Sequence, residues 1–290
     1  MIDSKNNSVD NIQSKVSVTV MIKTLNEEIN IEDAILSFPK GTPIIVFDSY
    51  SSDHTVEIAI RCGARLVQRK WDDESTHMNW AVQNIDFNSQ WVLQFDGDER
   101  MTPALWAEIL RAVSNPGNNI AFEIRHKDIF MGTWIRHSTF YPCWHVRLFR
   151  PQKAHWERLI NPIVIVDGDV GRIQEHFIHY PFSKGTVGWF RRHVHYADCE
   201  AQEVLKSAAE PLNLLNLFIG SYQLRRHTLK RFYYRMPLRP MLRFLTLFLL
   251  KRGFLDGRAG YYYARMQAAY ELMISIRAME LRRLEKGLPI

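Results

Sequence analysis

Apolar and polar positions follow two different periods along the first third of the chain. Short runs rich in β-branched and apolar residues have the composition of buried strands, and they lie at 16–22, 44–47, 64–68 and 91–95. Between these runs, apolar residues recur three and four positions apart, as helices packed on a core require. Strands that alternate with helices indicate a mostly parallel central sheet with right-handed crossovers, flanked by helices. The pattern predicts an α/β fold.

Further strands follow in the middle of the chain. Thr102-Pro103 has the form of a helix start, and Asp167-Gly168 marks a turn. The additional strands are predicted at 120–125, 146–149 and 163–166. We expect this second part of the sheet to be mixed rather than purely parallel.

A helical pattern covers 183–207. The residues Trp189, His193, Tyr196 and Glu200 fall within reach of one face, at offsets of four, seven and eleven. A polar and aromatic stripe of this kind can line a cleft. The alternative is a half-buried surface helix whose histidine is simply hydrogen-bonded.

Polar residues follow three of the predicted strands. Because parallel strands end at the same edge of a sheet, their side chains should converge there on a polar cleft. The residues are Thr24, Asn26, Glu27, Asp48, Asp53, Asp96 and Asp98. The chain contains neither a G-x-G-x-x-G fingerprint nor a G-x-x-x-x-G-K-[ST] phosphate loop. Phosphates bound in this cleft would therefore depend on a metal ion.

The segment Asp96-Gly97-Asp98 directly follows the strand at 91–95. Two carboxylates so close together repel each other unless a cation or donors lie between them. Hard divalent cations prefer oxygen ligands and leave room for substrate phosphates. The segment is a candidate metal site, although Asp and Gly are also ordinary turn residues.

Composition adds a charge asymmetry. Residues 181–290 contain 19 Lys and Arg against 8 Asp and Glu, a net charge of +11, which leaves 18 against 23, or −5, for residues 1–180. A basic, aromatic-rich half suggests an anionic partner. Three widely spaced cysteines give no disulfide framework and fit a reducing compartment. Residues 1–14 are polar, without the apolar segment of a signal peptide, and are expected to form a flexible tail.

The last third combines leucines and aromatics with Lys and Arg. Its apolar run at 241–250 would be roughly 15 Å long as a helix, too short to span a bilayer. A helix of this kind suits the headgroup layer of a membrane, and we expect residues 211–265 to bind the membrane surface. The alternatives are a helical subdomain or an oligomer interface, so a homo-oligomer is possible. No nucleic-acid-binding motif accompanies the charge, and no nucleic-acid partner is expected.

The chain resembles family 2 glycosyltransferases of the GT-A fold over about residues 16–281. The motifs that carry the resemblance to the family are 24–28, 48–55 and 96–99. The chain also resembles a bacterial branch of the family that builds lipopolysaccharide cores and exopolysaccharides. The motifs that carry this second resemblance are Asn79-Trp80-Ala81, Arg147-Leu148-Phe149-Arg150, His179-Tyr180, 192–196 with Glu200-Ala201, and 253–257. The family's activity is transfer of a sugar from a nucleotide diphosphate donor, usually with inversion.

The resemblance implies roles for particular residues. The nucleotide-sugar contacts would come from Thr24, Asn26, Glu27, Asp48, Asp53 and Asp96. Mn²⁺ or Mg²⁺ would be held by Asp98, with Asp96 and His179 beside it. The acceptor or phosphate side would include Trp189, Arg192, His193 and Tyr196. A structural role for His179 is the alternative to the metal role.

An inverting transfer also needs a general base on the acceptor side. Many relatives place it in a His-Glu pair, where this chain has Asn161-Pro162. Glu157 is the nearest carboxylate and is the predicted base, with Asp167 or Asp169 as the next candidates. A salt bridge to a neighbouring arginine is the structural alternative for Glu157.

These observations predict three segments: a tail at 1–14, a nucleotide-sugar-binding and catalytic GT-A domain at 15–182, and a helical acceptor-side and membrane-associating region at 183–290. The predicted function is metal-dependent, inverting transfer from a UDP-sugar, with a GDP-sugar as the alternative donor, to a lipid-linked saccharide for bacterial surface polysaccharide. The predicted location is the cytoplasmic face of the inner membrane, as a peripheral protein. The alternatives are a polyprenyl-phosphate sugar synthase and a non-catalytic nucleotide- or glycan-binding member.

Overall fold

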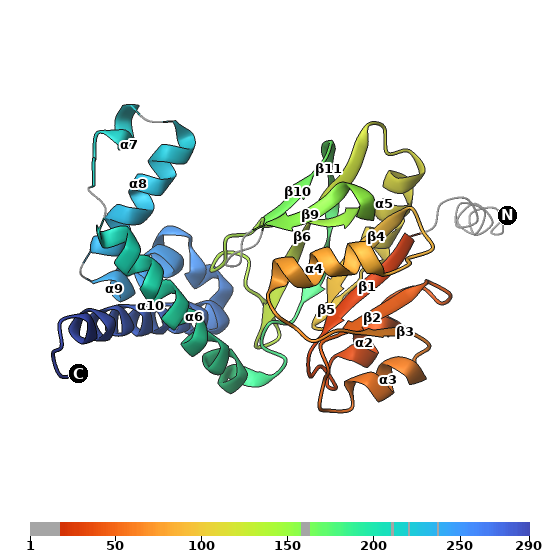
Figure 1. The fold of residues 1–290 in the computed structure, drawn as a ribbon, viewed down its shortest axis with the longest axis horizontal. Helices are drawn as coiled ribbons and strands as arrows, with labels where there is room; N and C mark the ends of the chain where they lie inside the picture. Colours follow the sequence, from red (N-terminus) through yellow and green to blue (C-terminus); the bar gives the residue numbers. More distant parts are fainter. Residues whose placement is uncertain (1–17, 158–162, 210–211, 220, 237) are drawn as a thin grey trace. The chain divides into compact units, whose positions relative to one another are not determined.

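The computed structural model describes residues 18–157, 163–209, 212–219, 221–236 and 238–290. The chain divides into two units (Figure 1). We call the described residues of Met1–Asp128 and Tyr141–Ser183 the sheet unit, and those of Ile129–Phe140 and Lys184–Ile290 the helical unit. The sequence placed a boundary at 182, but it gave no sign that residues 129–140 pack with the helices.

Four parallel strands form the first half of the sheet, as predicted. They pair in the order β3-β2-β1-β4. Thr24 lies beside Asp48, and Lys23 lies beside Asp96, so the carboxyl ends of three strands meet at one edge. The strands are β1 (Val18–Thr24), β2 (Ile44–Asp48), β3 (Arg65–Gln68) and β4 (Trp91–Asp96).

Helices cover both faces of these strands. Side chains alternate between the two faces of a strand, and here both faces carry apolar side chains that must be buried. Val20 and Ile22 of β1 belong to a core cluster with Ile31 and Leu105, whereas Met21 joins a second cluster with Met78. The helices are α2 (Ile31–Leu36), α3 (Thr55–Arg61), α4 (Glu74–Asn84) and α5 (Pro103–Ser114). The predicted start of α5 is confirmed, since the Thr102 side chain accepts a hydrogen bond from the Leu105 amide.

The second half of the sheet is mixed, as expected. Strand β8 is antiparallel to both β4 and β6, β11 is parallel to β6, and β5 is antiparallel to β11. A separate hairpin of β9 and β10 packs beside α4, where Asn79 exchanges two 2.8 Å hydrogen bonds with the Trp156 backbone. The bounds are β5 (Glu99–Arg100), β6 (Asn119–Phe130), β7 (Thr133–Trp134), β8 (Trp144–Phe149), η1 (Pro151–Lys153), β9 (Ala154–Glu157), β10 (Ile163–Val166) and β11 (Asp169–His179).

Two long helices form the centre of the helical unit. Helices α6 (Gly185–Ala209) and α10 (Gly257–Glu285) pack through small side chains, among them Ala197, Ala201 and Ala278, which allow a close approach. Buried Arg239 pairs with Glu271 at 2.6 Å and so ties α9 to α10. The remaining elements are α7 (Asn216–Ile219), α8 (Tyr222–Arg235), α9 (Arg239–Leu245), η2 (Thr246–Leu250) and η3 (Gly253–Asp256).

The predicted helix at 183–207 is confirmed as α6. The apolar run at 241–250 differs from the single helix expected, because it is divided between α9 and the π-helical turn η2. Among the described residues, no helix combines the length and the apolar character that crossing a bilayer requires.

Candidate functional site

Asp48 organises the loop after β2. Its carboxylate is fully buried and accepts hydrogen bonds from the Thr24 hydroxyl at 3.0 Å, the Ser51 amide at 2.9 Å and the Gln68 side chain at 3.0 Å. The Ser51 hydroxyl donates a further bond. These donors use the acceptor capacity of a carboxylate. Asp48 therefore ties the ends of β1 and β3 to the loop after β2 through hydrogen bonds.

The loops after β1 and β2 are bound to each other. The Asn26 side chain accepts from the Ser52 amide at 2.8 Å, and the Glu28 amide donates to Asp53 at 3.1 Å. Asn26 has φ of 56°, in the left-handed region that asparagine tolerates. The two predicted loops therefore meet at one edge, while the nucleotide contacts of Thr24, Asn26, Glu27, Asp48 and Asp53 stay predictions.

Asp53 is held as a carboxylate in this loop pair. Burial acts to raise its pKa, but hydrogen bonds from the Thr55 hydroxyl and from backbone amides outweigh burial and lower the pKa. The Thr55 amide donates to Asp53 at 3.0 Å. The charge at this position persists at neutral pH.

Gly97 is where the β4 corner meets the first loop. A Cβ atom on Gly97 would lie 2.7 Å from Cγ of Glu27, closer than real Cβ atoms approach their neighbours. The Gly97 amide also donates to the Lys23 carbonyl at 3.2 Å. The glycine of the Asp96-Gly97-Asp98 segment therefore permits close contact between the corner and Glu27.

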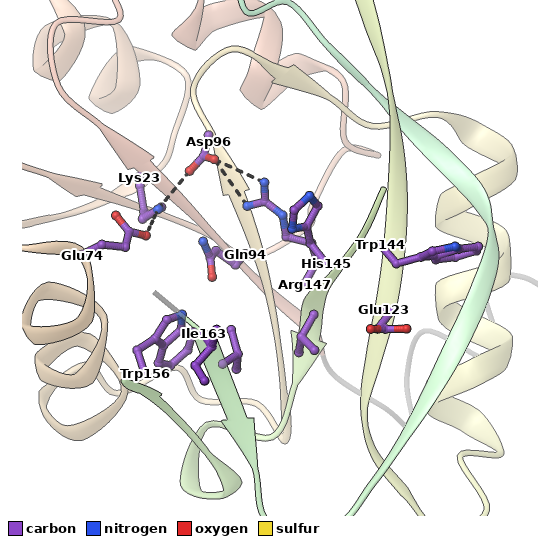
Figure 2. Close-up of a pocket in the computed structure, with 12 residues that line it drawn as sticks. Lys23, Glu74, Gln94, Asp96, Glu123, Trp144, His145, Arg147, Trp156 and Ile163 are labelled. Carbon is purple, nitrogen blue, oxygen red and sulfur yellow. Dashed lines mark hydrogen bonds and ion pairs between the residues drawn. The ribbon is translucent and has the colours of Figure 1, made fainter. Parts of the chain in front are cut away.

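Asp96 lies between two cations (Figure 2). Lys23 and Arg147 each approach its carboxylate at 3.3 Å, and Lys23 also pairs with Glu74. Burial alone would raise the pKa of Asp96, but the attraction to Lys23 and Arg147 outweighs burial and holds that pKa well below its usual range. Asp96 is consequently ionised and fixed in direction.

Glu99 completes this charge cluster. It pairs with Arg147 at 2.6 Å and accepts a hydrogen bond from the Asp96 amide at 2.8 Å. Burial, with some repulsion from Asp96, raises the pKa of Glu99 to about 7 despite the attraction to Arg147. The cluster can therefore change its charge near neutral pH.

A pocket of about 410 Å³ opens beside Asp96 in the sheet unit. Figure 2 shows charged groups around it from separate elements: Lys23 of β1, Glu74 of α4 and Arg147 of β8. Burial and nearby Arg147 lower the pKa of His145 to about 4, so this imidazole is neutral at physiological pH. The full lining is Lys23, Glu74, Gln94, Asp96, Glu123, Trp144, His145, Val146, Arg147, Trp156, Ile163 and Val164.

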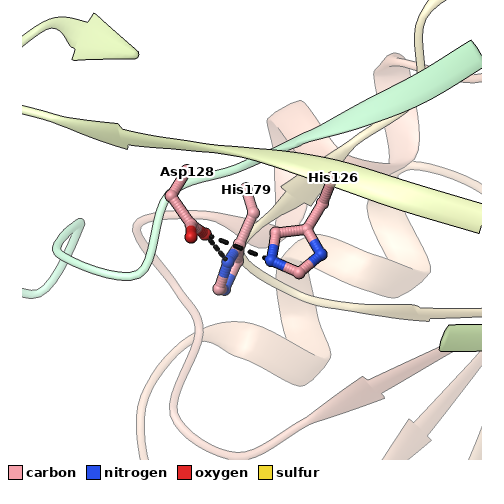
Figure 3. Close-up of side chains that lie close together, drawn as sticks. All are labelled: His126, Asp128 and His179. Carbon is pink, nitrogen blue, oxygen red and sulfur yellow. Dashed lines mark hydrogen bonds and ion pairs between the residues drawn. The ribbon is translucent and has the colours of Figure 1, made fainter. Parts of the chain in front are cut away.

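A second cluster surrounds His179 and includes Asp98, which follows Gly97 in the chain as Asp96 precedes it. The Asp98 carboxylate is 3.6 Å from Nε2 of His179, and the Asp128 carboxylate is 2.7 Å from Nδ1 of the same ring. Nε2 of His126 lies 3.4 Å from Asp128 (Figure 3). Asp98 and His179 are thus brought together, as predicted for a metal site, whereas Asp96 contacts Lys23 and Arg147. Metal roles for all three stay predictions.

His126 and Asp128 were missed by the sequence analysis. Both belong to β6, two positions apart on one face, and β11 pairs with β6 so that His179 is adjacent to Asp128. Candidate ligand atoms of His126, Asp128 and His179 all lie within 4.8 Å of one another. The His-x-Asp spacing on a strand was the available signal, but only the pairing with β11 gives it meaning.

This cluster fits Mn²⁺ or Mg²⁺ chemically. Carboxylates suit both ions, and imidazole adds a ligand that favours Mn²⁺. Nδ1 of His126 is buried and has no hydrogen-bond partner among the described residues. Burial acts to lower the pKa of His179, but hydrogen bonds to Asp128 and Asp98 raise it to about 10. The four side chains offer two carboxylates and two imidazoles, a set of oxygen and nitrogen ligands that a divalent cation can use.

The predicted base lies outside the pocket lining. Glu157 is exposed at the end of β9 and is 3.3 Å from His155, while the Asn161-Pro162 position lies outside the described residues. Asp167 pairs with Lys153 at 2.8 Å, and Asp169 is exposed at the start of β11. Glu74 and Glu123, which the sequence analysis missed, do line the pocket. Glu157 as the base stays a prediction.

The acceptor-side residues lie on α6, in the helical unit. Trp189 stacks on His193 with ring centroids 3.5 Å apart, and His193 meets the edge of Tyr270 on α10. Burial lowers the pKa of His193. Tyr196 and Arg192 are exposed. The predicted shared face is present, but Trp189 and His193 pack against α10, and the acceptor roles of Trp189, Arg192, His193 and Tyr196 stay predictions.

Comparisons with known proteins find similar sequences. An uncharacterized glycosyltransferase of Rickettsia typhi is 31% identical over 150 residues, half of each chain. One of Rickettsia conorii is 33% identical over 111 residues, 37% of this chain and 39% of its own. The chain thus spans half or less of the length of these curated relatives.

The comparison with solved structures matches glucosyl-3-phosphoglycerate synthase from Mycobacterium tuberculosis. Its complex with Mg²⁺ and UDP is 18% identical, with a TM-score of 0.38 over 50% of this chain and 60% of that one. Its complex with Mn²⁺, UDP and glucosyl-3-phosphoglycerate is 20% identical, with a TM-score of 0.35 over 46% and 50% of the two chains.

The family model named glycosyl transferase family 2 matches residues 19–174, more than half of the chain. The match contains both loops, the Asp96-Gly97-Asp98 corner, the pocket beside Asp96, and His126 and Asp128. The chain belongs to glycosyl transferase family 2.

Proposed function

We propose that the protein is a glycosyltransferase that uses a nucleotide diphosphate sugar and a divalent cation. The observation that carries the proposal is the pair of clusters on either side of Gly97: Asp96 with its two cations at a pocket, and Asp98 with His179 and Asp128. Two bound loops lie at the same sheet edge. Family membership supports this reading.

Asp98, His126, Asp128 and His179 are the residues that would hold Mn²⁺ or Mg²⁺. Such an ion supplies Lewis-acid stabilisation of the negative charge on the departing nucleotide diphosphate. The chain's part is to keep these ligands in place: β11 positions His179, and Asp128 orients the ring through Nδ1.

The charges beside the pocket orient the donor. Asp96, held by Lys23 and Arg147, offers a carboxylate of fixed direction to donor hydroxyl groups. The proton of the acceptor hydroxyl must pass to a carboxylate on the opposite side of the sugar. Glu157 is our proposed base, and Glu74 and Glu123 line the pocket itself together with Asp96.

We propose further that transfer inverts the sugar and that the acceptor is a lipid-linked saccharide destined for bacterial surface polysaccharide. The protein would work as a peripheral protein at the cytoplasmic face of the inner membrane, with a UDP-sugar as the favoured donor. The sequence motifs shared with that branch and the basic and apolar composition of residues 211–265 support this part of the proposal.

The test is a screen of UDP- and GDP-sugars with Mn²⁺ and lipid extracts, measuring release of free nucleotide and the anomeric configuration of the product. Asp98→Ala should lower turnover at least about 100-fold. The matched control is Glu32→Gln, an exposed carboxylate on α2 that should leave turnover unchanged. Full turnover in a chelator, or in Asp98→Ala, would contradict the metal role.

A further inference from the structure

A turn in the helical unit exposes four large apolar side chains. It joins η2 to η3 and carries Leu249, Leu250, Phe254 and Leu255, with Leu250 79% exposed. Single exposed apolar residues are common, but several of them close together mark a surface that binds a membrane or another molecule. We call residues 249–255 the apolar turn.

The apolar turn is rigidly built. Asp256, which is buried, accepts hydrogen bonds from the backbone amides of His137 and Ser138 at 2.9 and 2.7 Å, and from Nδ1 of His137 at 2.7 Å. A Cβ on Gly253 would lie 2.5 Å from the Leu247 carbonyl oxygen, so only glycine fits there. The backbone that carries the exposed apolar side chains is therefore anchored at Gly253 and Asp256.

Cations lie among these apolar side chains. Arg252 is exposed at the tip, and Nζ of Lys251 lies 4.3 Å from the ring centroid of Phe140, itself exposed. Between 251 and 265 the chain has four basic residues and one acid, which is the buried, hydrogen-bonded Asp256. A partner of this surface must accept apolar side chains and offer negative charge.

Aromatic rings continue the surface behind the apolar turn. Phe248 contacts Phe244 at 5.3 Å, Phe254 at 6.3 Å and Tyr261 at 5.7 Å between ring centroids. Tyr261 is 39% exposed. Aromatic rings of this kind are favoured at the level of lipid headgroups, where one part of the ring is apolar and another is wet.

We propose that the apolar turn inserts into the headgroup layer of an anionic membrane. Leu249, Leu250, Phe254 and Leu255 enter the boundary with the acyl chains, and Lys251 and Arg252 bind lipid phosphates. This inference rests on the membrane location in the proposed function and narrows it to seven residues. A nucleic acid would offer negative charge but no apolar environment for the leucine side chains, so we propose a lipid membrane as the partner.

The test is flotation of the full chain with vesicles of phosphatidylcholine alone or mixed with phosphatidylglycerol, without donor or acceptor. The wild type should bind only the mixed vesicles. Leu250→Ser/Phe254→Ser should weaken binding about 10- to 100-fold, and Arg252→Asn, which suits the left-handed φ of 61°, should weaken it about fivefold. The matched control is Met279→Ser/Leu284→Ser, two exposed apolar residues at the far end of α10, which should bind like the wild type.

Several results would overturn the inference. They are absence of binding by the wild type, equal binding to neutral vesicles, wild-type binding by Leu250→Ser/Phe254→Ser, or equal loss in the control variant. Circular dichroism and the stabilisation of each variant by UDP with Mn²⁺ check that the sheet unit is intact. Because flotation needs no turnover, failure of the membrane inference is distinguishable from failure of the proposed enzymatic function.

Discussion

His126 and Asp128 show why single residues were harder to assign than loops. Each is unremarkable in the sequence, and their shared role depends on β11, whose His179 lies 51 positions beyond Asp128. Asp98 was found because a strand followed by two carboxylates is a local pattern. Lys23 and Arg147 were missed as partners of Asp96 because they come from β1 and β8, which only the sheet places beside β4.

Replacing the missed residues tests the metal cluster. His126→Ala and Asp128→Asn should each weaken Mn²⁺ binding about 10- to 100-fold, because one removes a candidate ligand and the other removes the charge that orients His179. Isothermal titration with Mn²⁺ measures the change. The control is His54→Ala, which replaces an exposed histidine in the loop after β2 and should bind Mn²⁺ as the wild type does. Unchanged affinity in both cluster variants would exclude this site.

Metal binding should depend on pH with a definite sign. In the metal-free protein, hydrogen bonds to Asp128 and Asp98 raise the pKa of His179 to about 10 although burial opposes the shift. A metal ligand must be the neutral imidazole, so each ion displaces one proton below that pKa. The apparent Mn²⁺ affinity should then rise about tenfold per pH unit through neutrality.

Titration of Mn²⁺ binding between mildly acidic and mildly alkaline pH measures this slope. His179→Gln removes the proton that competes with the ion, so its affinity should be weaker and nearly flat with pH. A flat profile in the wild type would show that His179 does not bind the ion.

At the scale of elements, the first half of the sheet was predictable because each strand and helix is a local pattern. Three features were not. Strand β8 lies between β4 and β6 through pairings far apart in the chain, η2 interrupts an apolar run that reads as one helix, and residues 129–140 join the helical unit. All three depend on tertiary packing that overrides local propensity.

Lys23 links three elements of the sheet unit, since it is on β1 and pairs with Glu74 of α4 and Asp96 of β4. Burial acts to lower the pKa of Lys23, but Asp96 and Glu74 raise it, so the amine is charged. Lys23→Met leaves two carboxylates without this cation and should cost about 3 kcal/mol of stability. Urea unfolding measures the loss.

Arg61→Met is the matched control for that experiment. Arg61 pairs with Glu32 across two exposed side chains, and such pairs contribute about 0–1 kcal/mol. A similar small effect in Lys23→Met would show that the cation is not needed to balance Asp96 and Glu74.

For the whole molecule, the charge asymmetry seen in the sequence coincides with the division into two units. The net charge of +11 over residues 181–290 falls almost entirely on the helical unit, whereas the proposed donor and metal residues all belong to the sheet unit. The contrast is visible in the composition alone. Which apolar side chains are exposed beside the basic residues is not, because exposure depends on the fold.

Ligand binding should therefore stabilise one unit. At about 100 times its dissociation constant, UDP with Mn²⁺ should add about 2.7 kcal/mol to the free energy of unfolding of the sheet unit. Differential scanning calorimetry should show one transition that rises with ligand and a second that stays in place. A single transition that rises as a whole would contradict separate unfolding of the two units.

The hydrogen bonds around Asp48 have a kinetic consequence. Four donors already fix this carboxylate, and further bonds join the loop that follows it to the loop after β1. A nucleotide bound at the proposed donor site would meet loops whose backbone entropy was already lost during folding, so its affinity would not be reduced by ordering these loops. Nucleotide capture should then follow a single exponential whose rate rises linearly with concentration, without the plateau that a slow loop rearrangement would impose.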